Sequence, residues 1–371
     1  MLSTKLFRKF SEGVLVLTSN HNYVCKAVIN RPKTLNALTI PIIDYLQVCL
    51  KEWNEDKNIR VVLFSSEGGK AFCAGGNVRS LYLAREEGKL NILYDFFFKE
   101  YCLDYALSRM RPMQISIYDG IVMGGGAGIS MHSLIKIATD NSIFAMPECS
   151  LGLYPDVSGG YFLPRLPGSV GLYLALTGAR LTDQELVQAG VATHYVPKDK
   201  IDELKEALIK NVKPDLSIQE IESIVYPFTQ EVVGPLPYAR EIDKYFGGAK
   251  NVEEIYERLN DGNSWSADVL KRTEKHCPLS LKVSFEQYKR GKFMSLPEVF
   301  KMEYNLSLNF MLGTEFFEGF RALLLVRDRN PQWKYKTLAE VSDDLVKSYF
   351  ELPKGNFVDL DVEYEMLKAN R

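Results

Sequence analysis

The chain has 371 residues, with 45 lysines and arginines against 47 aspartates and glutamates. This length suffices for one large domain with a smaller appendage, because a single core rarely grows beyond about 250–300 residues. The near balance of charge disfavours a nucleic-acid partner. No apolar run approaches the ~18 residues of a membrane span, so we expect no membrane insertion.

Cysteines and histidines are scattered through the chain without the C-x-x-C spacing of zinc sites. The pattern therefore predicts neither a metal ion nor a disulfide framework, and it favours a reducing compartment. These residues are Cys25, Cys49, Cys73, Cys102, Cys149, Cys277, His21, His132, His194 and His276.

The first ten residues, Met1–Phe10, contain Lys5, Arg8 and Lys9 and no acid. Their leucines and phenylalanines would share one face of a helix, as in an organelle presequence. A disordered tail is the alternative, and the sequence leaves both open.

Alternating β-rich runs from Val14 to Ile29, broken at Asn20–Asn22, predict a hairpin. Thr39 and Pro41 then start a predicted helix, and Val61–Ser65 reads as a buried strand. The helix keeps apolar residues at helical spacing: Ile42, Ile43, Leu46, Leu50 and Trp53.

Two glycine-bearing turns follow predicted strands, at Ala74–Asn77 and at Gly124–Gly128. Glycine lets backbone N–H groups approach a ligand closely, and such N–H groups stabilise the negative charge that forms when a thioester carbonyl is attacked. We therefore predict Gly76 and Gly125 as the two donors. Each turn alone is more typical of an ordinary loop.

Two acids, Glu148 and Asp156, complete this candidate thioester site. Each also follows a proline, as an ordinary turn residue would. The glycine-rich turn does not fit a dinucleotide fingerprint, because Gly-x-Gly-x-x-Gly requires a third glycine that Ile129–His132 lacks. A Walker A motif is absent as well.

Beyond Val196 the sequence becomes charged and helical in period, and capping boxes at Ser217/Glu220 and Ser295/Glu298 support two helix starts. We expect a repeated β-β-α core over residues 11–200 and a helical region over residues 201–371. The predicted helices are Asp202–Asn211, Ile218–Val225, Val252–Leu259, Ala267–His276 and Leu296–Phe310.

A series of short motifs follows one another along nearly the whole chain. They are Asn30–Lys33, Leu35–Leu38, Ala71–Gly76, Asp119–Met123, Phe144–Glu148, Gly152–Asp156, Gly159–Leu166, Leu176–Leu181, Ala192–Val196, Pro278–Lys282 and Glu318–Ala322. In this order they resemble the crotonase (enoyl-CoA hydratase/isomerase) superfamily, and more closely its 3-hydroxyisobutyryl-CoA hydrolase branch.

The resemblance implies an α/β fold, a crotonase-like β-β-α spiral with an α-helical carboxyl-terminal region. It implies hydrolysis of an acyl-CoA thioester, 3-hydroxyisobutyryl-CoA, in valine breakdown, with coenzyme A as part of the substrate and no further cofactor. The implied location is the mitochondrial matrix, with peroxisome and cytosol as alternatives. Related folds often form trimers or hexamers, whereas the helical carboxyl region could instead complete the core within one chain, so the resemblance leaves a homo-oligomer open. Nothing implies a nucleic-acid or membrane partner.

The resemblance places the oxyanion hole at the N–H groups of Gly76 and Gly125, and the catalytic acids at Glu148 and Asp156. Glu100, Gly125, Glu148 and Asp156 match its substrate-binding positions, although the sequence around Glu100 alone predicts an exposed helix charge. Coenzyme A is expected near Lys33, Leu35 and Ala74, with its phosphates near Arg327 and Arg329.

Hydratases of the superfamily carry a second glutamate where this chain has Gly128, so the resemblance favours hydrolysis over hydration. In that reaction Glu148 either attacks the carbonyl or acts as a general base on water, and Asp156 holds the 3-hydroxyl or orients the water. Asn77 stands where the branch usually has aspartate. The alternatives are a hydratase or isomerase, and a catalytically silent acyl-CoA-binding or assembly protein.

Overall fold

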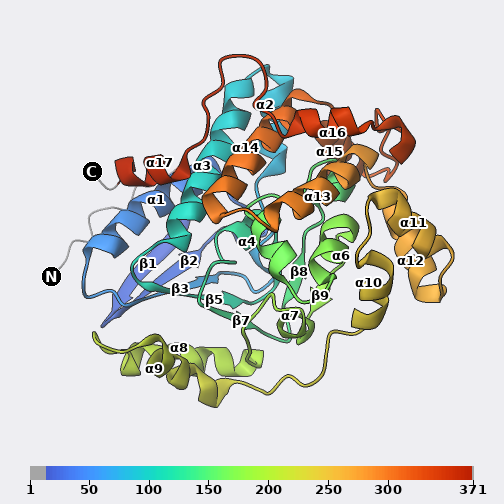
Figure 1. Cartoon of the computed structure of the whole chain (residues 1–371). Coiled ribbons are helices and arrows are strands. Elements are labelled where there is room, and N and C mark those ends of the chain that lie inside the picture. Colours follow the sequence, from blue (N-terminus) through green and yellow to red (C-terminus); the bar gives the residue numbers. More distant parts are fainter. Residues whose placement is uncertain (1–13, 370–371) are drawn as a thin grey trace.

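The computed structural model describes residues 14–369. Two sheets form its centre (Figure 1), one with strand order β1-β2-β3-β5-β7-β10 and the other with order β4-β6-β8-β9. The strands are β1 (Val16–His21), β2 (Val24–Ile29), β3 (Val61–Ser66), β4 (Ala71–Cys73), β5 (Met113–Tyr118), β6 (Ile121–Met123), β7 (Ile135–Ala138), β8 (Ile143–Ala145), β9 (Leu181–Thr182) and β10 (His194–Tyr195).

The helices surround these sheets and continue to the end of the described chain. They are α1 (Ile40–Glu55), α2 (Val78–Glu86), α3 (Leu90–Ser108), α4 (Gly125–Gly128), α5 (Gly159–Phe162), α6 (Val170–Thr177), α7 (Glu185–Gln188), α8 (Ile201–Asn211), α9 (Ile218–Val225), α10 (Ala239–Phe246), α11 (Val252–Asn260), α12 (Ser264–Thr273), α13 (Pro278–Gly291), α14 (Leu296–Leu312), α15 (Glu315–Phe320), α16 (Asp343–Tyr349) and α17 (Val362–Ala369).

The predicted β-β-α repeat is present, with consecutive strands assigned to different sheets. The pairs β3/β4, β5/β6 and β7/β8 each contribute one strand to the larger sheet and one to the smaller. Within the smaller sheet β4, β6 and β8 are parallel neighbours. Their carboxyl ends therefore meet at one edge, and the loops that leave this edge are those in which the sequence places its glycine turns and Glu148.

Helices cover both faces of the larger sheet. Alternate residues of β3 point to opposite faces, because Val61 and Leu63 pack with α8 and α9 whereas Val62 and Phe64 belong to the main core. In Figure 1, α8 and α9 lie below this sheet, and α1, α3 and α14 lie above it. The main core continues from Leu15 to Val362 and so includes both halves of the chain.

Predicted helices start and end close to their observed bounds where a cap fixes them. Both capping boxes form, at the starts of α9 and α14. The helix predicted at Ala267–His276 is displaced: α12 begins at Ser264, because the side chain of Asn263 accepts a hydrogen bond from the Ser266 N–H at 3.1 Å and ends the preceding loop.

Candidate active site

The two glycine turns lie side by side at the edge where β4 and β6 end. A Cβ atom at Gly75 would lie 3.3 Å from the Met123 carbonyl oxygen and 3.8 Å from the Gly125 nitrogen. Leu38 bridges the first turn by donating to the Gly75 oxygen and accepting from the Asn77 N–H, which leaves the Gly76 N–H outside that bridge. The N–H groups of Gly76 and Gly125 are thus neighbours, as an oxyanion hole requires.

The second turn needs glycine for two reasons. Gly124 has φ +46°, in the left-handed region that disfavours side chains. At Gly125 a Cβ would overlap the Glu100 Oε1 atom and come within 2.9 Å of Leu38 Cδ1. Gly125 is also the first residue of the short helix α4, so its N–H has no acceptor within that helix.

Glu148 lies against these turns. It follows β8 and Pro147 as the first residue of a 3-10 helix, Glu148–Leu151. Its side chain is 5% exposed, and Oε1 would be 3.3 Å from a Cβ at Gly124. Burial raises the pKa of Glu148 well above its usual value, and the nearby charge of Asp156 raises it further.

Asp156 lies in the loop that follows this 3-10 helix and is also 5% exposed. The Tyr101 hydroxyl of α3 donates to its Oδ2 at 3.0 Å, and the hydroxyls of Tyr154 and Ser307 lie 3.1 and 2.7 Å from that of Tyr101. Burial raises the pKa of Asp156 to about 7, although the bond from Tyr101 opposes the rise. The two predicted catalytic acids therefore share one buried region and influence each other's charge.

The backbone after Asp156 takes an uncommon shape that Glu303 stabilises. Val157 and Ser158 have φ values of +51° and +70°. From α14, the Glu303 carboxyl accepts from the Ser158 N–H at 2.7 Å and the Gly160 N–H at 2.9 Å. Gln287 donates to it as well, at 2.9 Å. Glu303 thus fixes the loop that carries Asp156.

Sequence reasoning missed Glu303, although a signal was present. This acid stands among Val299, Phe300, Leu306 and Phe310, at the helical spacing of their apolar stripe. A charged residue on such a stripe must find buried partners. That rule alone pointed to a structural or functional acid in α14.

Glu100 is buried, which corrects the exposed helix charge that its local sequence predicts. It lies on α3 with 2% of its surface exposed. Its Oε1 atom lies so near Gly125 that a Cβ added to this glycine would overlap it. Burial raises the pKa of Glu100 well above its usual value, and the charges of Asp156 and Asp104 raise it further. The structure therefore brings together Gly76, Gly125, Glu148, Asp156 and Glu100.

The residues expected to bind coenzyme A fall into two groups. Ala74 donates its N–H to the Leu35 carbonyl at 3.1 Å, next to exposed Lys33, so these three lie beside the first glycine turn. Arg327 and Arg329 lie in an exposed turn, with φ values of +63° and +54°. Their binding roles stay predictions.

That exposed turn follows α15, which packs on the helix leaving the oxyanion loop. The ring of Phe320 lies 4.9 Å from that of Tyr82 on α2, and the Arg85 guanidinium lies 4.8 Å from the Phe317 ring. Asn77 caps α2 by accepting from the Ser80 N–H at 3.4 Å, as expected. Asn77 therefore fixes the start of α2.

A family model described as enoyl-CoA hydratase/isomerase matches residues 24–350. The chain belongs to the enoyl-CoA hydratase/isomerase family. This match covers every strand pair of the β-β-α repeat and all the helices from α1 to α16.

Several proteins named mitochondrial 3-hydroxyisobutyryl-CoA hydrolase are similar to this family member over most of their length. The protein from Xenopus tropicalis is 42% identical over 335 residues, covering 88% of this chain and 86% of its own. The protein from Homo sapiens is 40% identical over 336 residues, with the same two coverages.

Two solved structures have the same fold. A carnitinyl-CoA dehydratase from Mycobacterium thermoresistibile has a TM-score of 0.85 at 33% identity, covering 95% of this chain and 99% of its own. An enoyl-CoA hydratase from Rhodobacter sphaeroides 2.4.1 has a TM-score of 0.81 at 30% identity, covering 91% and 97%. These structures confirm the crotonase-like fold.

Other features of this family member lie outside the acid-rich site. Within residues 14–369, no group of three or more histidine, cysteine or acidic side chains is arranged to hold a metal ion, and no helix is long and apolar enough to cross a membrane. The described cysteines are all free thiols. The presequence prediction for Met1–Phe10 lies outside the described residues.

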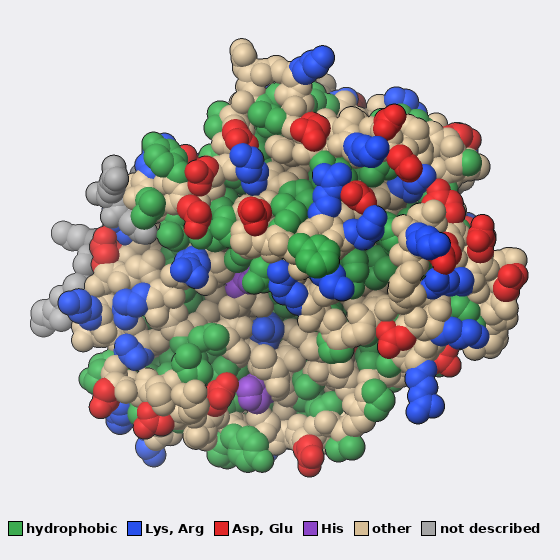
Figure 2. All heavy atoms as spheres, viewed as in Figure 1, with side chains coloured by type: hydrophobic (Ala, Val, Ile, Leu, Met, Phe, Trp, Pro, Cys, Tyr) green, Lys and Arg blue, Asp and Glu red, His purple; other side chains and the backbone are tan. Residues whose placement is uncertain are grey.

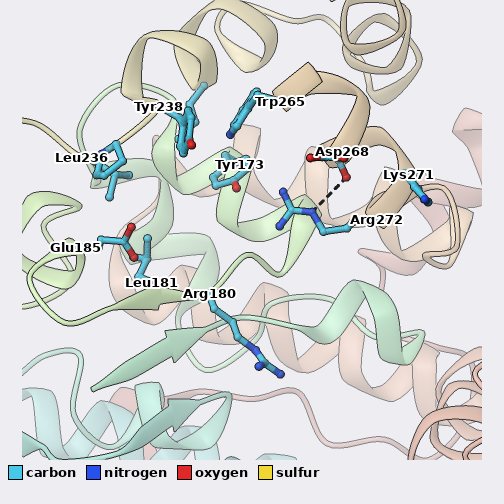
Figure 3. Close-up of a pocket in the computed structure, with 12 residues that line it drawn as sticks. Tyr173, Arg180, Leu181, Glu185, Leu236, Tyr238, Trp265, Asp268, Lys271 and Arg272 are labelled. Carbon is cyan, nitrogen blue, oxygen red and sulfur yellow. Dashed lines mark hydrogen bonds between the residues drawn. The ribbon is translucent and has the colours of Figure 1, made fainter. Parts of the chain in front are cut away.

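A separate hollow of about 440 Å³ lies between α6, α10 and α12 (Figure 3). The rings of Tyr238 and Trp265 stack there at 5.7 Å. Arg180, Lys271 and Arg272 contribute positive charge, which Glu185 and Asp268 offset. None of the predicted site residues lines this hollow, so it is separate from the candidate active site.

Proposed function

We propose that the chain hydrolyses acyl-CoA thioesters, and that its substrate is 3-hydroxyisobutyryl-CoA, which yields 3-hydroxyisobutyrate and free coenzyme A. The observation that carries this proposal is the buried Glu148 carboxyl, which lies against the turn holding the Gly125 N–H. The hydrolase names of relatives about 40% identical over most of the chain support it.

The geometry supports two routes. In one, a Glu148 oxygen attacks the thioester carbon while the N–H groups of Gly76 and Gly125 hold the oxyanion. The C–S bond breaks, the thiolate of coenzyme A leaves, and water cleaves the resulting mixed anhydride. In the other, Glu148 takes a proton from a water molecule that attacks the carbonyl directly. Both routes require ionised Glu148.

Hydration of an enoyl-CoA is the second candidate, because the two similar solved structures are named as a dehydratase and a hydratase. Addition of water across a double bond uses an acid and a base on the same bond. Gly128 removes one of the two glutamates found in hydratases, and no side chain can enter at this position without meeting Asp104. The remaining acids therefore favour hydrolysis.

The relatives' names also support a mitochondrial location, and we place the protein in the matrix, in valine breakdown. Coenzyme A enters as part of the substrate, with no other cofactor. On the face shown in Figure 2, positive and negative side chains are interspersed, which agrees with a small-molecule substrate rather than a polyanion. The homo-oligomer expectation is tested by light scattering during size-exclusion chromatography.

The test is release of free thiol from 3-hydroxyisobutyryl-CoA, beside hydration of crotonyl-CoA, for wild type, Glu148→Gln and the exposed control Glu257→Gln. We expect thiol release by wild type and the control, a kcat loss of roughly 10²–10⁴ in Glu148→Gln, and no hydration. Hydration without thiol release would establish the second candidate. Binding of the thioester with no turnover would leave only a binding or assembly role.

A further inference from the structure

A buried acid beside the site has no role in the mechanism above. Asp104 lies on α3, one helical turn after Glu100, and is 0% exposed. Neither of its carboxyl oxygens has a hydrogen-bond partner among the described residues. A buried polar group without a partner costs about 1–3 kcal/mol, so Asp104 weakens the fold unless a bound molecule supplies the partner.

The carboxyl of Asp104 lies between the two halves of the proposed site. A Cβ atom at Gly128 would overlap its Oδ2 and lie 2.8 Å from both its Cγ and the Cβ of Val157. Gly128 ends α4, the helix that begins with the oxyanion donor Gly125, and Val157 directly follows Asp156. The Asp104 carboxyl therefore occupies the space that a side chain at residue 128 would need, three residues after the oxyanion donor Gly125.

The surroundings of Asp104 favour its neutral form. Its acidic neighbours are Glu100 on the same helix, Asp156 in the loop and Glu303 on α14. No positively charged group is among those that change the pKa of Asp104. Burial, then Asp156 and then Glu303, raise its pKa well above the usual value. A neutral carboxyl carries one O–H donor and one carbonyl acceptor, which together match an alcohol.

We propose that Asp104 is a specificity residue that hydrogen-bonds the hydroxyl group on the acyl chain of the substrate. The inference rests on the proposed hydrolase function. The offset from Gly125 to Gly128 is almost one helical turn, about 4.5 Å, which is the scale of the two carbons and one oxygen that follow the thioester carbonyl. The carbonyl binds at Gly125, and the hydroxyl reaches Asp104.

This assignment divides the work between the acids. Asp156 already accepts a hydrogen bond from Tyr101, and its charge raises the pKa of Glu148. With the hydroxyl held by Asp104, Asp156 is left to orient water. Glu100, whose Oε1 also has no described partner, lies on the Gly125 side of the same helix face.

The experiment compares 3-hydroxyisobutyryl-CoA with isobutyryl-CoA, which has the same carbon skeleton without the hydroxyl. The ratio of their kcat/KM values is measured for wild type, Asp104→Ala, Asp104→Asn and the exposed control Asp95→Ala on the same helix. We expect Asp104→Ala to lower the ratio by roughly 10–100-fold. Asp104→Asn, which keeps a donor and an acceptor, should retain it within about fivefold, and Asp95→Ala should leave it unchanged.

A structural role would lower both kcat/KM values by the same factor and leave the ratio intact, which overturns the proposal. Should Asp104→Ala not fold, Gly128→Ala provides a second test, because its methyl group must displace the Asp104 carboxyl. An unchanged ratio of kcat/KM values in Gly128→Ala would also overturn the proposal. Wild type that hydrolyses neither thioester would refute the proposed function. Wild type that hydrolyses both equally well would refute only the role of Asp104.

Discussion

At the scale of single residues, the site is a set of buried acids that control one another's protons. Because burial and Asp156 raise the pKa of Glu148 well above its usual value, a large fraction of Glu148 is protonated where a free glutamate is fully ionised. Both hydrolytic routes need the carboxylate. The rate should therefore depend on pH in a range where surface glutamates no longer titrate.

We predict that kcat/KM for thiol release falls as pH decreases, with a midpoint well above the ~4.3 of a free glutamate. Asp156 has a pKa of about 7, and its negative charge raises the pKa of Glu148. In Asp156→Asn one negative neighbour is gone, which lowers the pKa of Glu148 and should move the midpoint to lower pH. A pH–rate profile of both proteins, corrected for uncatalysed hydrolysis, measures this. An identical midpoint in the variant would rule out the coupling.

The same shift predicts how the stability effect of Asp156→Asn depends on pH. A carboxyl with a raised folded pKa binds its proton more tightly in the folded state. Its favourable contribution is complete below the unfolded pKa, near 4, and is lost as pH rises through about 7. The melting temperature of Asp156→Asn relative to wild type should therefore increase between pH 5 and pH 8. A difference that stays constant over this range would show that Asp156 is not buried as a titrating group.

At the scale of secondary-structure elements, α14 acts on the reaction through the loop that it holds. Glu303 accepts from two backbone N–H groups of that loop, at Ser158 and Gly160. Without it, the left-handed residues Val157 and Ser158 lose the bonds that stabilise their conformation, and Asp156 loses its fixed position.

We predict that Glu303→Ala costs about 2–4 kcal/mol in the free energy of unfolding, because the buried hydrogen bonds to Ser158, Gly160 and Gln287 and a buried contact are lost. It should lower kcat by roughly 10–100-fold with a smaller effect on KM. The matched control is Glu298→Ala in the capping box of the same helix, which should cost about 1 kcal/mol and leave kcat unchanged. Urea unfolding and steady-state kinetics measure both. Equal kcat losses in the two variants would mean that helix stability alone matters.

Sequence patterns predicted the elements that alternation, helical period, an apolar run or a cap marks. These are the hairpin, β3, α1, α8, α9 and α14. For α3 the sequence indicated a helix around Glu100 but neither its extent nor the burial of Glu100, since its many buried residues leave no clear polar stripe. The motif residues Glu148 and Asp156 were recognised, but Tyr101 and Asp104, which α3 contributes, depend on tertiary packing that the local sequence does not show.

At the scale of the whole molecule, the two regions expected at residues 11–200 and 201–371 share their packing. Helices α8 and α9 cover the face of the larger sheet that carries Val61 and Ile115. On the other side α14 packs on α3, and α13 packs on α5 and α6. Ser307 and Glu303 reach into the site from this second region. The boundary at residue 200 stays a prediction, but the residues beyond it complete both core and site.

We predict that a fragment of residues 1–200 does not fold cooperatively and has no thioesterase activity. Removing α8 and α9 exposes one face of the larger sheet, and removing α13 and α14 exposes the other core around Tyr101 and Tyr154, which are 0% exposed in the full chain. A fragment of residues 1–230 regains α8 and α9 but not α13 and α14. It should therefore be more soluble than residues 1–200 and still inactive. Near-ultraviolet circular dichroism and thermal melting of both fragments, beside the full chain, provide the measurement. A cooperative melt of residues 1–200 would show instead that the β-β-α core is an independent domain and that the helical region only adds residues to its site.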